Sequence, residues 1–302
     1  DDNGNDVGKD GAVDEKGGDH GACSPAAGGG AAAAGTFSGI TASNTVMKEQ
    51  LLRNYLKKRR FAPIKNNRNM KVALVQLNYR IGDFAGNAEK IISSVSRAKE
   101  EGAELAVFSE LAVTGYYPED LLEKKEFIQE AEETIREIAR HCNGIGALVG
   151  GPAINDGDRG KQLYNAAWYL EDGKIKDNFY KSLLPTYDVF DEYRHFEPNR
   201  LFHLLHLNHT RIAVTICEDL WDEQPVCNEF GKNKLYLTSP LEELDVLEPE
   251  LIINLSASPF SANQESFRKD ILIKKAATAG IPLVYVNQVG AQAELIFDGG
   301  SV

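Results

Sequence analysis

The chain has 302 residues, of which 42% are hydrophobic and 26% are charged, enough for one large α/β domain or two smaller ones with an apolar core. The formal net charge of −12 argues against a nucleic-acid binder, and the sequence shows neither a bilayer-spanning apolar run nor a secretory signal, so we expect no membrane association. The four cysteines (Cys23, Cys142, Cys217 and Cys227) form no CxxC pair, which predicts a reduced, cytoplasmic protein without a disulfide framework or thiolate zinc site.

The first 69 residues divide into two segments. Residues 1–46 are rich in Gly, Ala and Asp and lack apolar periodicity, so we predict a disordered tail. Residues 47–69 contain a short amphipathic helix whose basic cluster at 57–60 precedes a proline. Such a helix can bind a membrane surface or a partner, but a helix this short more often packs on its own domain. We assign it no function.

From residue 70 onward the sequence predicts a folded domain, 70–302. Apolar runs predict strands over 70–77, 103–110, 145–151, 211–217, 250–258 and 281–290. Helical periodicity predicts helices over 86–102, 127–144 and 265–280. A hairpin over 164–181 should turn at Asp172–Gly173. Helices and strands alternate mainly at the two ends, which favours one layered α/β domain with a mixed sheet.

Several familiar motifs do not apply. The stretch GIGALVGG (144–151) lacks the GxGxxG spacing of a dinucleotide site, and no GxSxG offers a serine nucleophile. HLLHLNH (203–209) resembles a metal cluster, but His206 would face away from the other two histidines on a strand. NDGDRGK (155–161) is typical of a turn, because no glutamate follows at the EF-hand distance.

Three polar residues remain, each at the end of an apolar strand. LAVFSE ends in Glu110, IKDNFYK ends in Lys181 and IAVTIC ends in Cys217. In open α/β sheets, ligands and chemistry gather beyond the carboxyl ends of strands. Taken singly, Cys217 could be a small buried hydrophobe, and Glu110 and Lys181 could be halves of a salt bridge.

Together the three residues can carry out acyl transfer without a histidine. A thiol is mostly protonated at neutral pH, so a cysteine nucleophile needs a base or a nearby positive charge. Glu110 can take the proton, and Lys181 can stabilise first the thiolate and then the oxyanion of a tetrahedral intermediate. Spacing in the sequence does not show whether they meet in space.

Five stretches of residues 70–302 resemble the nitrilase superfamily, and more closely the N-terminal glutaminase domain of glutamine-dependent NAD synthetases. They are SELAVTGYYPEDLL (109–122), YKSLLPTYDVFDEYRHF (180–196), ICEDLW (216–221), NLSASPF (254–260) and ELIFDGGS (294–301). The resemblance implies an α/β fold, the nitrilase-like α-β-β-α sandwich with mixed sheets.

The resemblance also implies roles for individual residues. Glu110, Lys181 and Cys217 would be a catalytic triad that hydrolyses the side-chain amide of glutamine through a thioester. Glu192 would support Lys181. The glutamine pocket would be lined by Tyr116, Tyr187, Glu218, Trp221 and Ser258. Tyr116 and Tyr187 can equally be core aromatic residues whose hydroxyls reach a partner.

Two stretches depart from the family. SANQESFRK (261–269) stands where a glycine and a basic residue are expected soon after the proline, and GAQAELIF (290–297) stands where an Asn-Asp pair is expected. Both departures concern the substrate pocket and communication between domains rather than the triad.

The family's synthetase domain is absent from this sequence. Its Ser-Gly-Gly phosphate-binding loop does not occur, and the sequence stops at FDGGSV (297–302), where the first domain should end. We therefore expect a half of a larger enzyme or a separate ammonia-producing chain, homo-oligomeric, with a synthetase domain or chain as its partner. We expect no cofactor or metal here, with ATP and Mg needed only by the absent domain.

Two other functions stay open. The chain could be a free-standing nitrilase-type amidase or carbamoylase that acts on another small amide. It could also be a non-catalytic scaffold that keeps the fold only to assemble oligomers.

Overall fold

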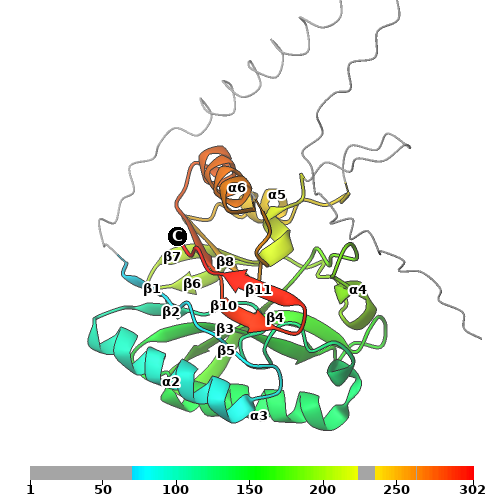
Figure 1. Ribbon diagram of the computed structural model, residues 1–302. Helices are drawn as coiled ribbons and strands as arrows, with labels where there is room; N and C mark the ends of the chain where they lie inside the picture. Colours follow the sequence, from blue (N-terminus) through cyan, green and yellow to red (C-terminus); the bar gives the residue numbers. More distant parts are fainter. Residues whose placement is uncertain (1–69, 224–234, 263) are drawn as a thin grey trace, which may run out of the picture. The chain divides into compact units, whose positions relative to one another are not determined.

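Two β-sheets stacked face to face, each with helices on its outer side, make up the described part of the chain (Figure 1). The computed structural model describes residues 70–223, 235–262 and 264–302. The predicted tail, the predicted helix at 47–69, Cys23 and Cys227 lie outside these residues.

The first sheet has five strands in chain order. They are β1 (Val72–Leu74), β2 (Leu105–Val107), β3 (Gly146–Ile154), β4 (Leu163–Glu171) and β5 (Lys174–Tyr180). The first three run parallel, and the last two add antiparallel pairs. Parallel neighbours need crossover connections, which are the helices α2 (Phe84–Glu100) and α3 (Lys125–His141). Both helices cover the outer face of this sheet (Figure 1).

The second sheet has four strands: β6 (Leu205–Leu207), β7 (Thr210–Ile216), β8 (Leu251–Leu255) and β9 (Leu283–Val286). The pair β6–β7 is antiparallel and the other pairs are parallel. Its outer face packs against α5 (Pro240–Asp245) and α6 (Gln264–Ala279) (Figure 1). The remaining elements are η1 (Glu119–Glu123), α4 (Glu192–His195), η2 (Cys217–Leu220) and the hairpin of β10 (Val289–Gln292) and β11 (Leu295–Asp298).

Along each central strand, successive side chains pack alternately into two different hydrophobic cores. On and just after β2, Leu105 and Val107 pack between the two sheets, whereas Ala106 and Phe108 pack under α2 and α3. A strand that is buried on both faces must be apolar throughout, because successive side chains point to opposite faces. The continuous apolar runs in the sequence therefore reflect strands inside a layered molecule.

The predicted α-β-β-α sandwich with mixed sheets is confirmed, and so is the hairpin between β4 and β5. Asp172 and Gly173 form its turn with φ angles of 51° and 75°, the left-handed region that a two-residue hairpin loop requires. The strand patterns predicted a layered domain with a mixed sheet, and the first sheet is mixed. They did not show that the chain leaves this sheet after β5 and builds a second. No helix in the described ranges is long and apolar enough to cross a membrane.

Candidate active site

The three residues picked out at strand ends meet at one end of the stacked sheets. Glu110 follows β2 and Lys181 follows β5, and two antiparallel steps make these strands parallel to each other. Their carboxyl ends therefore lie at the same edge of the first sheet. Cys217 follows β7 of the opposite sheet, where it opens η2 with a φ of 42°, a left-handed conformation rare outside glycine. This sharp turn stops the strand at the nucleophile candidate.

A close approach between backbones holds the Glu110 turn in place. At Gly150 on β3, a Cβ atom would lie 2.3 Å from Ser109 O and 2.4 Å from Leu111 N. Any side chain at Gly150 would therefore push the Glu110 segment away from β3.

Lys181 lies between two carboxylates. Its Nζ is 2.6 Å from Glu110 Oε1 and 2.8 Å from each carboxylate oxygen of Glu192. All three side chains are 0% exposed. Burial lowers the pKa of Lys181, but the charges of Glu110 and Glu192 raise it by more, so the pKa stands well above its ordinary value. Lys181 is therefore an ammonium group in this site.

Further donors saturate both carboxylates. Asn165 Nδ2 on β4 donates to Glu110 Oε1 at 2.8 Å and to Glu192 Oε2 at 3.4 Å. The backbone N–H of Ala257, after β8, donates to Glu110 Oε2 at 3.0 Å. The hydroxyl of Tyr116 donates to Glu192 Oε1 at 2.6 Å. Because every partner is a donor, the network fixes the orientation of both carboxyl groups. Burial raises the pKa of Glu192, and the charge of Lys181 and the donors Lys181 and Tyr116 act in the opposite direction.

Cys217 is buried, with 9% of the residue exposed, and its thiol interacts electrostatically with this network. Burial raises its pKa well above the ordinary value, the negative charge of Glu110 raises it further, and the positive charge of Lys181 opposes them. The resting thiol is therefore protonated, and it needs a base before it can attack. Glu110 is the carboxylate with the strongest effect on it.

Asp219 ties the Cys217 turn to the strand that ends at Lys181. One carboxylate oxygen accepts from Ser182 N and Leu183 N, each at 2.9 Å, and the other accepts from Ile216 N at 3.0 Å. Burial raises its pKa to about 6, although the three N–H donors act in the opposite direction. Asp219 was not among the residues predicted from the sequence, although it lies inside the ICEDLW stretch.

Glu218 is a second buried carboxylate beside the thiol. Its Oε1 accepts from the hydroxyl of Tyr187 at 2.9 Å and from that of Tyr236 at 2.8 Å. Burial raises its pKa to about 7, against the charge of Lys181 and the two tyrosine donors. Tyr236 had no signal in the sequence, because it lies in an irregular stretch 18 residues beyond its partner.

The other two predicted pocket residues, Ser258 and Trp221, are both buried, in different surroundings. Ser258 follows Ala257, which holds Glu110, and its own N–H donates to Asn287 Oδ1 at 2.9 Å. Trp221 belongs to the core under α5 and α6, with its ring centroid 5.8 Å from that of Phe267. The structure therefore brings Tyr116 to Glu192 and Tyr187 to Glu218, and it places Trp221 on the outer side of η2.

The described arrangement can perform acyl transfer. It contains a thiol, a carboxylate able to accept its proton and an ammonium able to stabilise an oxyanion. A separate group of possible metal ligands, Asp120, Glu123 and His195, contains no member of this trio. The three histidines of HLLHLNH are not such a group: His203 pairs with Asp177, and His206 is exposed on β6.

Residues 71–302 match the family model for carbon-nitrogen hydrolases. The chain is 42% identical over 236 residues to the glutamine-dependent NAD(+) synthetase of Synechocystis sp., covering 76% of this chain and 41% of that protein. It superposes with a TM-score of 0.67 and 31% identity on the glutamine-dependent NAD+ synthetase of Acinetobacter baumannii in complex with adenosine diphosphate, over 77% of this chain and 40% of that one.

A nitrilase-superfamily amidase from Nesterenkonia sp. AN1 is also similar, with a TM-score of 0.63 and 25% identity over 78% of this chain and 84% of that one. The matched structure is a mutant with acrylamide added at its active site cysteine. The chain spans about two fifths of the length of the curated synthetases that it matches.

Proposed function

The chain belongs to the carbon-nitrogen hydrolase family, and on that premise we propose that its site hydrolyses the side-chain amide of glutamine to glutamate and ammonia. The observation that carries the proposal is the meeting of Glu110, Lys181 and Cys217 at one end of the two sheets. The buried carboxylate of Glu218 beside them supports glutamine in particular, because the substrate's α-ammonium group needs a negative partner.

In the first half of the proposed reaction, Cys217 Sγ attacks the amide carbon while Glu110 takes the thiol proton. Lys181 and the backbone N–H of Glu218 hold the oxyanion of the tetrahedral intermediate. The C–N bond then breaks, Glu110 returns the proton to the leaving nitrogen, and ammonia departs. What remains is a thioester between Cys217 and the glutamyl group.

In the second half, Glu110 takes a proton from a water molecule, whose oxygen attacks the thioester carbon. The C–S bond breaks, the proton returns to the sulfur, and glutamate leaves. Protein side chains and water supply each group in this sequence, so the reaction is proposed to proceed without a metal or cofactor.

We also propose that the ammonia serves a synthetase domain or chain that uses it to make NAD. The synthetase relatives, of which this chain spans about two fifths, support this partner. ATP and Mg would be needed only by that partner. The working form is proposed to be homo-oligomeric and cytoplasmic.

A second candidate function is the hydrolysis of another small amide by the chain on its own. The likeness to the Nesterenkonia amidase favours it, because this chain covers 84% of that protein rather than two fifths. The departures at 261–269 and 290–297 also leave the substrate end of the site different from the family pattern. The third possibility is a non-catalytic scaffold.

Ammonia release from glutamine, asparagine and N-carbamoyl amines separates these functions. We expect the wild-type chain to release ammonia from glutamine, more strongly when a synthetase partner is added, and Cys217→Ala to release none. Cys142→Ala is the matched control, because Cys142 is a buried free cysteine under α3, outside the site. Cleavage of a carbamoyl amine but not glutamine would support the second function. Equal inertness of wild type and Cys217→Ala on every substrate, with the partner present, would support the scaffold.

A further inference from the structure

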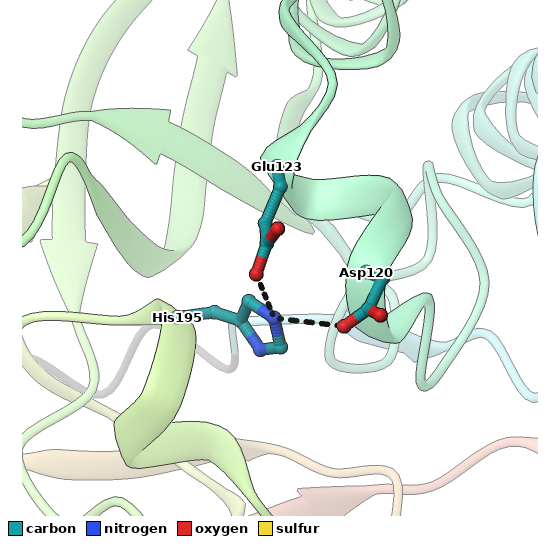
Figure 2. Close-up of side chains that lie close together, drawn as sticks. All are labelled: Asp120, Glu123 and His195. Carbon is teal, nitrogen blue, oxygen red and sulfur yellow. Dashed lines mark ion pairs between the residues drawn. The ribbon is translucent and has the colours of Figure 1, made fainter.

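Three side chains that the proposed reaction does not use converge between η1 and α4. Asp120 and Glu123 lie on η1, and His195 lies on α4 (Figure 2). His195 Nε2 is 3.8 Å from Asp120 Oδ1 and 3.7 Å from Glu123 Oε1. The two carboxylates share one face of η1 because residues i and i+3 stand above one another in a 3₁₀ helix.

The hydrogen bonds around His195 determine which of its nitrogens carries a proton. The hydroxyl of Tyr117 donates to Asp191 O at 3.1 Å, and it lies 2.7 Å from His195 Nδ1. A carbonyl oxygen can only accept, so the single hydroxyl proton belongs to that bond. Nδ1 must then donate its own proton to the hydroxyl oxygen. In the neutral ring, Nε2 therefore carries no proton and presents a lone pair.

That lone pair has no hydrogen-bond partner and is buried. The side chain of His195 is 5% exposed, and its Nε2 is one of the buried polar atoms left without a hydrogen bond. It points at two carboxylates, which repel a lone pair (Figure 2). A buried unsatisfied atom of this kind is costly, and a cation between the three groups would satisfy it.

We propose that Asp120, Glu123 and His195 bind a divalent transition-metal cation of the zinc class. The three ligand atoms lie within 4.8 Å of one another. An ion placed between atoms at this spacing lies roughly 2.2–2.4 Å from each, so a shift of a few tenths of an ångström brings the three groups to the distances of about 2.0–2.2 Å that zinc keeps from nitrogen and carboxylate oxygen. A histidine nitrogen beside two carboxylates suits zinc or its neighbours better than calcium or magnesium, which prefer oxygen alone.

The surroundings of His195 match those of a metal-binding histidine. Such a residue usually donates its second N–H to an oxygen that fixes the orientation of the ring. The Tyr117 hydroxyl fills this role, and its ring packs edge-on against the imidazole at 5.8 Å between centroids. The ring therefore needs no rearrangement to present Nε2 to an ion.

Arg194 is the group with which the ion would compete. Its Nη2 lies 2.9 Å from Asp120 Oδ1 and 3.1 Å from Glu123 Oε1, the same oxygens that face His195. The Arg194 side chain is 49% exposed, and ion pairs so open to solvent contribute little stability. A divalent ion can therefore displace the guanidinium, which is free to turn toward solvent.

Binding here would join two segments that border the candidate active site. Helix α4 begins at Glu192, which holds Lys181, and η1 follows the segment that carries Tyr116. The site itself contains no residue of the triad, so its existence does not depend on the proposed function.

Titration of zinc into the chelator-treated 302-residue chain tests the site by calorimetry, in a Cys217→Ser background that removes a thiol able to bind zinc. We expect His195→Ala to weaken one binding event at least about 100-fold and Glu123→Gln to weaken it about tenfold. Arg194→Gln should tighten it about tenfold, because the competing cation is gone. His203→Ala is the matched control, since His203 pairs with Asp177 on the surface, and it should change nothing.

Two results would overturn the proposal. One is equal zinc affinity in the parent, His195→Ala and Glu123→Gln proteins, with circular dichroism showing that the variants are folded. The exposed Glu123 keeps this comparison valid even where the buried His195 variant unfolds. The other is an NMR spectrum in which both His195 nitrogens are protonated without metal and unchanged by zinc, which would make the cluster an ordinary ion pair.

Discussion

At the scale of single residues, the site is a set of buried charges that stabilise one another. Lys181 lies between the carboxyl groups of Glu110 and Glu192, and burial raises the pKa of Glu192 against the charge of Lys181. Removing one member of a buried, hydrogen-bonded set leaves an unpaired charge, which costs more than the pair contributes. Burial and the charge of Glu110 raise the pKa of Cys217, so the thiol stays neutral until a base takes its proton.

Glu218 gives the site a pH dependence whose direction follows from its pKa. Burial raises this pKa to about 7, so the carboxyl loses its charge as the pH falls through 7. A substrate with an α-ammonium group then loses its ion-pair partner. We expect the KM for glutamine to rise about tenfold between pH 8 and pH 6, as measured by ammonia release.

Two variants check that Glu218 is the titrating group. Tyr236→Phe removes one donor to the ionised carboxylate, so the pKa and the midpoint of the KM profile should move to higher pH. Glu218→Gln should flatten the profile and hold KM near the high value that the wild type reaches at low pH. A profile that is the same in Glu218→Gln and wild type would assign the pH dependence to another group.

At the scale of elements, the site depends on how strands end. Glu110, Lys181 and Cys217 each leave a buried strand directly, and η2 begins at Cys217 with a positive φ. A rigid strand precedes each of these residues and a tight turn follows it, so their side chains have little conformational freedom. Asp219 joins two of these ends across 36 to 37 residues of sequence.

Asp219→Asn should loosen this junction. An amide offers one acceptor oxygen where the carboxylate offers two, so at least one buried N–H among Ile216, Ser182 and Leu183 loses its partner. We expect about 1–3 kcal/mol less stability in urea unfolding and a kcat about tenfold lower or more, with a smaller change in KM.

Asp177→Asn is the control for this prediction, because Asp177 is a partly exposed aspartate on β5 that pairs with His203. It should leave both stability and kcat within experimental error of wild type. If Asp219→Asn behaves in the same way, the three backbone contacts do not position the site.

At the scale of the whole molecule, stability depends on the core between the two sheets. Leu148 on β3 is fully buried there, among side chains of β7 and β8. Leu148→Ala should cost about 2–5 kcal/mol in urea unfolding, since the rigid sheets cannot close over the cavity. The matched substitution Leu201→Ala, at a leucine that is 83% exposed, should cost less than about 0.5 kcal/mol. Equal losses in both variants would mean that the sheets do not pack as described.

Much of the fold is visible in local patterns. The predicted segments agree to within a few residues with the helices α2, α3 and α6 and with the strands from β1 to β9 other than the short β6. They could be predicted because burial on one or both faces produces a regular pattern of apolar residues in the sequence. Short elements such as η1, α4 and β6 were not predicted. They are too short to show a hydrophobic period, and contacts with distant segments stabilise them. The hydroxyl of Tyr117, for example, donates to Asp191 O just before α4.

The sequence by itself determined that Glu110, Lys181 and Cys217 each end an apolar strand, since strand period and the residue that follows are local properties. Family resemblance, rather than spacing, added Glu192 and Glu218. Only the tertiary structure decided that Lys181 lies between Glu110 and Glu192, that Tyr236 reaches Glu218, and that His195 faces two carboxylates. Those contacts join residues 11 to 75 positions apart, and the order in which the strands pair and the packing of the segments beyond their ends, which no local pattern records, bring them together.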